Sequence, residues 1–159
     1  MLDKNTFSIV LDNAPLVSID LCLVWDSKLL LAKRNNDPLK GHWFTPGGRL
    51  NKNEPWQRGL ERIAKLELGL DVNSSKFNLM GVFDHFYSNS FLDENISTHY
   101  VNLPHYMIYD CCPTIQLDEQ HDESNWFDIK ELSYNKGTHK YMRKYANWLL
   151  NLEKDLKLG

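Results

Sequence analysis

Residues 45 to 70, TPGGRLNKNEPWQRGLERIAKLELGL, combine a glycine pair, several charged side chains and a helical pattern. Pro55 suits the first turn of a helix and Gly69 suits its C-terminal cap, so the stretch predicts a helix over 55–68. At helical spacing, Glu67 stands at the end of an otherwise apolar stripe that includes Ile63. Such a carboxylate is either a partly exposed acid at a helix end or a ligand for a cation.

Three further side chains have types that could bind or activate a phosphorylated substrate. His121 lies in the acidic run EQHD, where Glu119 and Asp122 could orient it as a general base. The alternative is a surface histidine in an acidic loop. Arg34 and Arg49 could bind phosphate oxygens through two hydrogen bonds each, and Arg49 directly follows the glycine pair. Taken singly, both arginines could instead be solvated surface residues.

Two polar residues interrupt apolar segments. Asp20 lies inside LVSIDLCLVWD, and a buried carboxylate requires a partner. His85 stands beside the aromatic residues Phe86 and Tyr87, which is equally typical of a packed core histidine and of a ligand contact.

The elements that must position these residues follow from hydrophobic periodicity and turn residues. We expect helices over 3–12, 55–68 and 139–156, and strands over 16–26, 27–34, 77–88 and 98–111. Residues 35–44 and 89–97 are expected as loops, and residues 117–129 as a loop leading to a short strand. Strands on both sides of a helix, with another helix at the end, predict a layered α/β domain.

The composition excludes several classes of function. The 159 residues are 42% hydrophobic and 25% charged, with a net charge of −3. That balance predicts a globular protein with no electrostatic footprint for nucleic acid or an anionic membrane. The N-terminus lacks the apolar run of a secretory signal, and no segment approaches the roughly 20 apolar residues of a membrane span. Three cysteines, two of them adjacent and none in CxxC spacing, favour reduced thiols in a cytoplasm.

The stretch 45–70 resembles the Nudix box of nucleoside diphosphate hydrolases, G-x5-E-x7-R-E-U-x-E-E-x-G-U, where U is bulky and aliphatic. Six specified positions fall at the required spacing, namely Gly48, Glu54, Arg62, Glu67, Gly69 and Leu70. The resemblance implies the Nudix fold, an α/β/α sandwich around a mixed β-sheet, as one domain over residues 1–159. Glu54 and Arg62 are expected to form a structural ion pair that holds the box loop to its helix.

Two acidic positions of the box are lost, because Ile63 and Leu66 stand where the pattern has glutamate. Positions 63, 66 and 67 are expected on one helix face, where the full pattern gathers carboxylates around several Mg²⁺ ions. With Glu67 alone, we expect one Mg²⁺ ion per active site. Hydrolysis at phosphorus depends on the metal cluster, so either activity is lost or the chemistry uses one metal and a base elsewhere.

This variation resembles one Nudix branch, the GDP-mannose mannosyl hydrolases. The likeness extends to PLVSID at 15–20, KR at 33–34, HFY at 85–87, THYV at 98–101 and DEQHD at 118–122. The resemblance implies a homodimer that acts on a GDP-sugar. Water attacks the anomeric carbon of the sugar, GDP leaves, and the sugar is released with inverted configuration.

The same resemblance implies a role for each candidate residue. His121 is the general base, Arg34 and Arg49 stabilise the departing diphosphate, and Tyr100 donates a hydrogen bond to it. Asp20 and His85 contact the sugar or the diphosphate.

The resemblance also implies a metal site and a contribution from a second subunit. The metal ligands are the main-chain carbonyl of Gly47, the carboxylate of Glu67 and the side-chain carbonyl of Gln120. Phe7 belongs to an N-terminal segment that reaches the nucleotide site of the partner subunit.

Two alternatives stay open at this point. One is an ordinary Nudix pyrophosphatase that cleaves a nucleoside diphosphate sugar or ADP-ribose at phosphorus. The other is a Nudix domain that binds such a ligand without catalysis.

Overall fold

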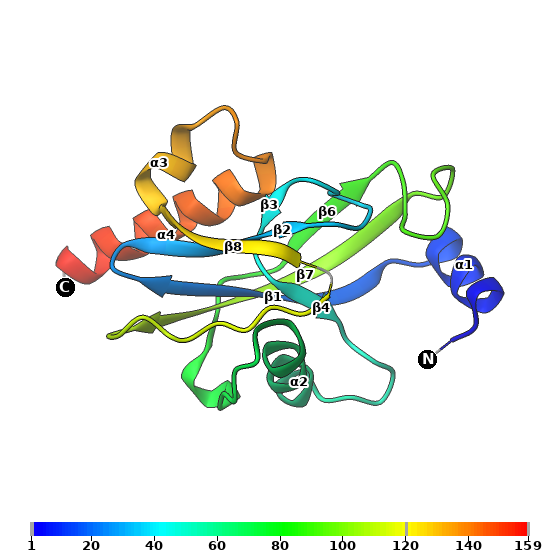
Figure 1. Ribbon diagram of the computed structural model, residues 1–159, viewed down its shortest axis with the longest axis horizontal. Helices are drawn as coiled ribbons and strands as arrows, with labels where there is room; N and C mark the ends of the chain where they lie inside the picture. The colour runs from blue at the N-terminus through cyan, green and yellow to red at the C-terminus, as the bar shows by residue number, and fades with distance from the viewer. Residues whose placement is uncertain (1, 120, 159) are drawn as a thin grey trace.

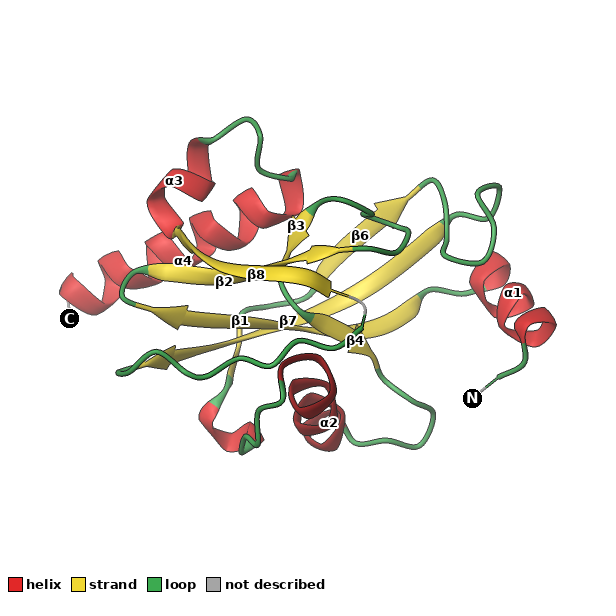
Figure 2. Ribbon diagram, viewed as in Figure 1, coloured by secondary structure: helices red, strands yellow, loops and turns green. Residues whose placement is uncertain are grey.

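A mixed β-sheet lies between helices on both of its faces (Figure 1). The computed structural model describes residues 2–119 and 121–158, and for residues 121, 122, 157 and 158 it describes the main chain alone. Figure 2 shows α2 on one side of the sheet and α3 with α4 on the other, so the α/β/α sandwich expected from the Nudix resemblance is confirmed.

Four α-helices and eight strands make up the described fold. The helices are α1 Lys4–Asn13, α2 Trp56–Leu68, α3 Ile129–Tyr134 and α4 Lys140–Leu158, with a short 3₁₀ turn at Ser74–Lys76. The strands are β1 Leu16–Trp25, β2 Lys28–Arg34, β3 Trp43–Phe44, β4 Gly47–Arg49, β5 Asn78–Leu79, β6 Phe83–Tyr87, β7 Thr98–Tyr109 and β8 His121–Asp128.

β1 is central to the sheet and has a different partner along each half of one edge. Its first half pairs with β4 and its second half with β2, both antiparallel, while its other edge runs parallel to β7. β8 pairs with β2, and both β5 and β6 pair with β7. β2 and β4 pair with different halves of the same edge of β1 and therefore diverge from each other along that edge.

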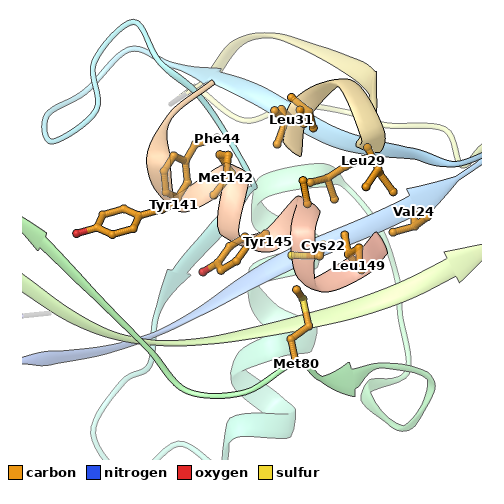
Figure 3. Packing of buried hydrophobic residues seen from close by; sticks show 13 residues of the cluster. Cys22, Val24, Leu29, Leu31, Phe44, Met80, Tyr141, Met142, Tyr145 and Leu149 are labelled. Carbon is orange, nitrogen blue, oxygen red and sulfur yellow. The ribbon is translucent and has the colours of Figure 1, made fainter. Parts of the chain in front are cut away.

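The alternation of side chains along β1 fills two separate cores. Ile19, Leu21 and Leu23 pack against Leu60 and Ile63 of α2. On the other face, Cys22 and Val24 pack against α4 through residues such as Met142, Tyr145 and Leu149. In Figure 3 the hydroxyls of Tyr141 and Tyr145 point away from Leu29 and Val24.

Most of the elements expected from the sequence are confirmed, with three differences. The expected strand over 77–88 is divided into β5 and β6, because Gly81 adopts a φ of +150° between them. The expected loop over 35–44 ends in the short strand β3. The region 117–129 is mostly the eight-residue strand β8, and α3 follows it without having been predicted.

None of the described helices combines the length and the apolar character needed to cross a membrane.

Candidate active site

The pairing of β1, β7 and β6 gathers polar side chains on the face of the sheet that α4 covers. Ser18 of β1 is the register partner of Asn102 in β7, and Tyr100 of β7 is the register partner of His85 in β6. Side chains two residues apart on a strand share a face, so Asp20 joins Ser18 on this side. The residues that interrupt apolar segments in the sequence therefore meet at one place.

A cavity opens at this place, between the diverging strands β2 and β4. It is lined by six of the residues predicted from the sequence, namely Asp20, Arg34, Gly47, Arg49, His85 and Tyr100. We call this cavity the cleft. A larger cavity of about 330 Å³ lies between β3, the end of β8, α3 and the loop before α4, but none of those six residues lines it. The cleft is the candidate active site because it concentrates the charged groups.

A chain of hydrogen bonds runs through buried side chains in the wall of the cleft. The Ser18 hydroxyl donates to Oδ1 of Asn102, and Nδ2 of Asn102 contacts Nδ1 of His85. Nε2 of His85 lies 3.4 Å from the hydroxyl of Tyr145, which donates to Oδ2 of Asp20 over 2.6 Å. The buried carboxylate of Asp20 thus has a hydrogen-bond partner, the hydroxyl of Tyr145.

Burial shifts the protonation of both titratable groups in this chain. Desolvation raises the pKa of Asp20 to about 6, although the hydrogen bond from Tyr145 and the charge of Arg34 oppose the shift. Desolvation lowers the pKa of His85 to about 3, and the positive charges of neighbouring residues add to the effect. His85 is therefore a neutral imidazole at neutral pH, and its ring stacks on Tyr141 with centroids 3.8 Å apart.

Two arginines supply positive charge to the cleft. Within the described part of the chain, the Nε atom of Arg34 is buried and has no hydrogen-bond partner. The guanidinium of Arg49 lies 4.2 Å from the ring centroid of Phe7 and 5.6 Å from that of Phe91. Phe7 is only 8% exposed, so the structure places it against Arg49 of its own chain.

The ion pair expected within the box is confirmed by geometry. Nε of Arg62 lies 2.6 Å from Oε1 of Glu54, and Nη2 donates to Oε2 of Glu54 and to the carbonyl of Arg49. Arg62 therefore joins α2 to the loop before it and also holds the main chain at Arg49. Asn51 adds a third link by donating its main-chain N–H to Glu54.

Positions 63, 66 and 67 of α2 differ in their burial. Ile63 is 1% exposed within the core beneath the sheet, and Leu66 is 60% exposed. The side chain of Glu67 is buried, like that of Ile63. The three positions lie on one side of the helix, as i, i+3 and i+4 do, but Leu66 reaches the solvent while Ile63 packs inward.

Glu67 has a second carboxyl group beside it, which the sequence did not reveal. Burial is the main cause that raises the pKa of Glu67 to about 8, and the charge of Asp118 and a hydrogen bond with it add to the shift. Arg34 opposes the shift, so its positive charge also acts on Glu67. Two adjacent carboxyls that share a proton form a site where a cation could replace that proton.

Gly47 lies where no side chain can fit. A Cβ atom at this position would stand 2.5 Å from Oδ1 of Asp20 and 2.6 Å from the carbonyl oxygen of Ile19. Carboxylate and main-chain oxygens are hard ligands of the kind that Mg²⁺ prefers, so Glu67, Asp118 and Gly47 fit such an ion chemically. Among the described residues, no three His, Cys, Asp or Glu side chains form a metal-binding group. A metal here would thus depend on main-chain and ligand oxygens as well.

Two predicted site residues are not described at their side chains. Gln120 lies outside the described residues, and the structure describes the main chain of His121 alone. That main chain pairs with Arg34 at a register shift between β2 and β8. The predicted base and the predicted phosphate-binding arginine are therefore strand neighbours.

Four residues that complete the cleft or support it were not predicted from the sequence: Ser18, Asn102, Asp118 and Tyr145. Ser18, Asn102 and Asp118 lie within or next to segments that resemble the Nudix branch, but no rule of spacing distinguishes them. Tyr145 was assigned to core packing because its helical stripe is apolar, and its ring does pack there.

The family model described as NUDIX domain matches residues 15–149, and the chain belongs to this family. Nudix hydrolases generally use divalent metal ions, in line with the oxygen ligands at the cleft. The chain is 36% identical over 148 residues to the low-salt glycan biosynthesis protein Agl8 of Haloferax volcanii. The alignment covers 93% of this chain and 90% of that protein.

Other similar proteins differ in their described activities. The chain is 27% identical to an ADP-ribose pyrophosphatase of Methanocaldococcus jannaschii, over 84% of this chain and 75% of that protein. A MutT NUDIX hydrolase structure from Burkholderia pseudomallei superposes with a TM-score of 0.70 at 23% identity, covering 86% of this chain and 98% of that one. The NUDIX domain of Shewanella oneidensis NrtR, complexed with ADP ribose, superposes with a TM-score of 0.58 at 17% identity, covering 82% and 80%. These two structures establish the shared fold.

Proposed function

We propose that the protein hydrolyses GDP-mannose, or a related GDP-hexose, to GDP and free sugar by attack of water at the anomeric carbon. One observation carries the proposal: of the three box positions on α2, only Glu67 carries a carboxylate, which lies within the field of Arg34 of the cleft, whereas Ile63 is buried and Leu66 faces solvent. Attack at phosphorus by a metal cluster would need further carboxylates on this helix. Attack at carbon needs mainly a stabilised leaving group and a base.

The departure of the diphosphate is assisted by cations and hydrogen-bond donors of the cleft. As the bond between C1 and the phosphate oxygen breaks, its electron pair passes to the diphosphate, which becomes more negative. Arg34 and Arg49 line the cleft and can each bind phosphate oxygens through two hydrogen bonds. Burial raises the pKa of Tyr100, so its hydroxyl stays protonated and can donate to the leaving group.

His121 is proposed to take the proton from the attacking water. An imidazole is an effective base near neutral pH, and the main chain of His121 lies beside Arg34. His85 is a poor candidate for this role, because its pKa is lowered to about 3 and its Nδ1 atom is occupied by Asn102.

We propose one Mg²⁺ ion, held by Glu67, the Gly47 carbonyl and Gln120, with Asp118 close by. When bound, the ion would neutralise charge on the diphosphate. The buried carboxyl pair supports this assignment, since Glu67 would exchange its proton for the cation.

The family relatives support a sugar-nucleotide substrate. The relative with 36% identity is named for glycan biosynthesis, a process whose sugar donors are generally nucleotide-activated. A homodimer is proposed from the resemblance to the mannosyl hydrolase branch. Because Phe7 packs on Arg49 of its own chain, α1 lies next to the cleft whether or not a second subunit also contributes.

A pyrophosphatase that cleaves ADP-ribose is the second candidate, favoured by the relative in Methanocaldococcus jannaschii. In this case Asp118 would supply a carboxylate that α2 lacks, beside Glu67.

Product analysis separates these possibilities. Purified protein with Mg²⁺ is incubated separately with GDP-mannose, GDP-fucose and ADP-ribose, and nucleotides and reducing sugar are quantified by chromatography. We expect GDP and free sugar from a GDP-hexose. GMP with a sugar phosphate, or AMP from ADP-ribose alone, would establish the pyrophosphatase. Tight binding of a nucleotide sugar without turnover would establish a binding domain.

A further inference from the structure

The chain of hydrogen bonds in the wall of the cleft joins β1, β7, β6 and α4. Its members are Ser18, Asn102, His85, Tyr145 and Asp20, and none of them is more than 7% exposed. Buried polar groups without partners are costly, so the interior must satisfy each of these side chains in turn. The proton positions are consequently determined by the members themselves.

The hydrogen bond from Ser18 sets the direction of this chain. Because Oδ1 of Asn102 accepts from Ser18, the amide nitrogen is the atom that faces Nδ1 of His85. An amide nitrogen can only donate, so Nδ1 must be the unprotonated ring nitrogen. A neutral His85 then carries its proton on Nε2, which points to the hydroxyl of Tyr145.

Tyr145 passes this orientation on to Asp20. Its oxygen faces Nε2–H of His85, so its own proton is directed to Oδ2 of Asp20, 2.6 Å away. With Oδ2 engaged, Oδ1 of Asp20 is turned toward Gly47, next to the position that a Cβ there would fill. The carboxylate therefore presents one oxygen to the box loop and keeps the other in the interior.

We propose that Tyr145 and Asn102 are positioning residues: Asn102 holds His85 in its Nε2–H tautomer, and Tyr145 holds Asp20 with one oxygen directed at the box loop. The catalytic consequence rests on the proposed function, whereas the tautomer of His85 does not. The hydrogen bond between Tyr145 and Asp20, which are far apart in the sequence, would then explain why the apolar face of α4 retains a buried tyrosine hydroxyl.

The tautomer is tested by ¹⁵N NMR of the imidazole nitrogens at pH 7 without substrate. In the wild-type protein we expect Nδ1 of His85 to be unprotonated and Nε2 to be protonated. In Asn102→Asp the side chain keeps nearly the same size, and one carboxylate oxygen still accepts from the Ser18 hydroxyl. The other oxygen replaces the amide nitrogen that faces Nδ1 of His85, and it can only accept a hydrogen bond from Nδ1. We therefore expect Nδ1 to become protonated in this variant. Ser18→Ala provides a milder change, and it should produce a mixture of tautomers because the amide is no longer oriented.

The positioning of Asp20 is tested by kinetics of Tyr145→Phe. We expect kcat to fall by about 10- to 100-fold with KM changed less than threefold, because the ring stays in the core while Asp20 loses its anchor. Tyr141→Phe is the matched control. Tyr141 lies one helical turn away on α4 and stacks on the same imidazole, and among the described residues its hydroxyl bonds to the main chain of Phe86. The control should lose stability but keep the His85 tautomer and kcat.

Three results would overturn the proposal. An Nε2–H tautomer unchanged in Asn102→Asp would exclude the role of Asn102. A kcat of Tyr145→Phe within twofold of wild type would exclude the role of Tyr145. Equal losses of kcat in Tyr145→Phe and Tyr141→Phe would indicate general loosening of α4. If no substrate is turned over, the NMR result still decides the tautomer.

Discussion

Burial gives several side chains of the cleft their chemical character. Asp20 and Glu67 are both raised in pKa by desolvation, and each is opposed by the charge of Arg34. The Nε atom of Arg34 is itself buried and unpaired within the described residues. The guanidinium of Arg34 thus lies within the field of two carboxyl groups, and a bound diphosphate or metal would change the protonation of both carboxyls together.

His121 is expected to act on the rate of chemistry alone. In His121→Gln, we predict that kcat falls by about 10²–10⁴-fold, the usual range for lost general-base catalysis, with little change in KM. Steady-state kinetics with GDP-mannose measures both constants. His99→Gln, which removes a half-buried imidazole paired with Asp84, should keep wild-type rates. Activity retained by His121→Gln would assign the base to another residue.

Glu67 is expected to make the fold less stable as the pH rises. Its pKa of about 8 in the folded protein exceeds the ordinary value of 4.5, so between these values the folded state keeps a proton that the unfolded chain has lost. Stability therefore decreases with pH across this window. Each pKa unit of this difference corresponds to about 1.4 kcal/mol. Between about pH 5 and pH 8.5 the wild-type protein should therefore lose a few kcal/mol more of its free energy of unfolding than Glu67→Gln loses.

Urea unfolding at pH 5 to 9 without divalent metal measures this difference. Added Mg²⁺ should restore the stability of the wild-type protein at high pH, because the cation binds the ionised carboxylate in the folded state. Glu153→Gln near the end of α4 is the control and should follow the wild-type pH dependence. The same dependence in Glu67→Gln would show that this carboxyl is not the group with the raised pKa.

At the scale of elements, α2 is attached to the loop before it by polar links as well as by its apolar face. Leu60 and Ile63 pack beneath the sheet, and Arg62 bonds both to Glu54 and to the carbonyl of Arg49. The helix therefore controls the position of a residue that lines the cleft. At its other end, Gly69 adopts a left-handed φ of +67° and ends the helix directly after the segment that carries Glu67.

Breaking the ion pair of this helix should act on stability first. Glu54→Gln removes the charge that Arg62 binds, and we predict a loss of about 1–3 kcal/mol in the free energy of unfolding, as for hydrogen bonds to charged groups. Half-maximal activation by Mg²⁺ should shift less in this variant than in Glu67→Gln.

Arg58→Gln is the control on the same helix, because its contact with Glu61 is exposed and should contribute at most about 1 kcal/mol. Denaturant unfolding and Mg²⁺ titrations of the turnover rate measure both effects. A larger effect of Glu54→Gln on Mg²⁺ activation than on stability would identify Glu54 as a metal ligand.

For the whole molecule, local patterns predicted the elements, whereas contacts between distant segments determined the site. The helix over 55–68 and the Glu54–Arg62 pair could be expected because their signals lie within one short stretch. The pairing of Asp20 with Tyr145 spans 125 residues, and no periodicity reports it. Asp118 beside Glu67 was missed for the same reason. The eight-residue length of β8 was underestimated because its polar residues resemble those of a loop.

The central claim is that water attacks carbon, and the position of the incoming oxygen tests it most directly. GDP-mannose is incubated with the protein and Mg²⁺ in ¹⁸O-water, mass spectrometry locates the label, and proton NMR identifies the first sugar anomer formed. Attack at C1 breaks the bond between carbon and oxygen, so we expect unlabelled GDP, labelled mannose and initially the β anomer from an α-linked substrate. Label in a nucleotide phosphate, or GMP as a product, would contradict the account.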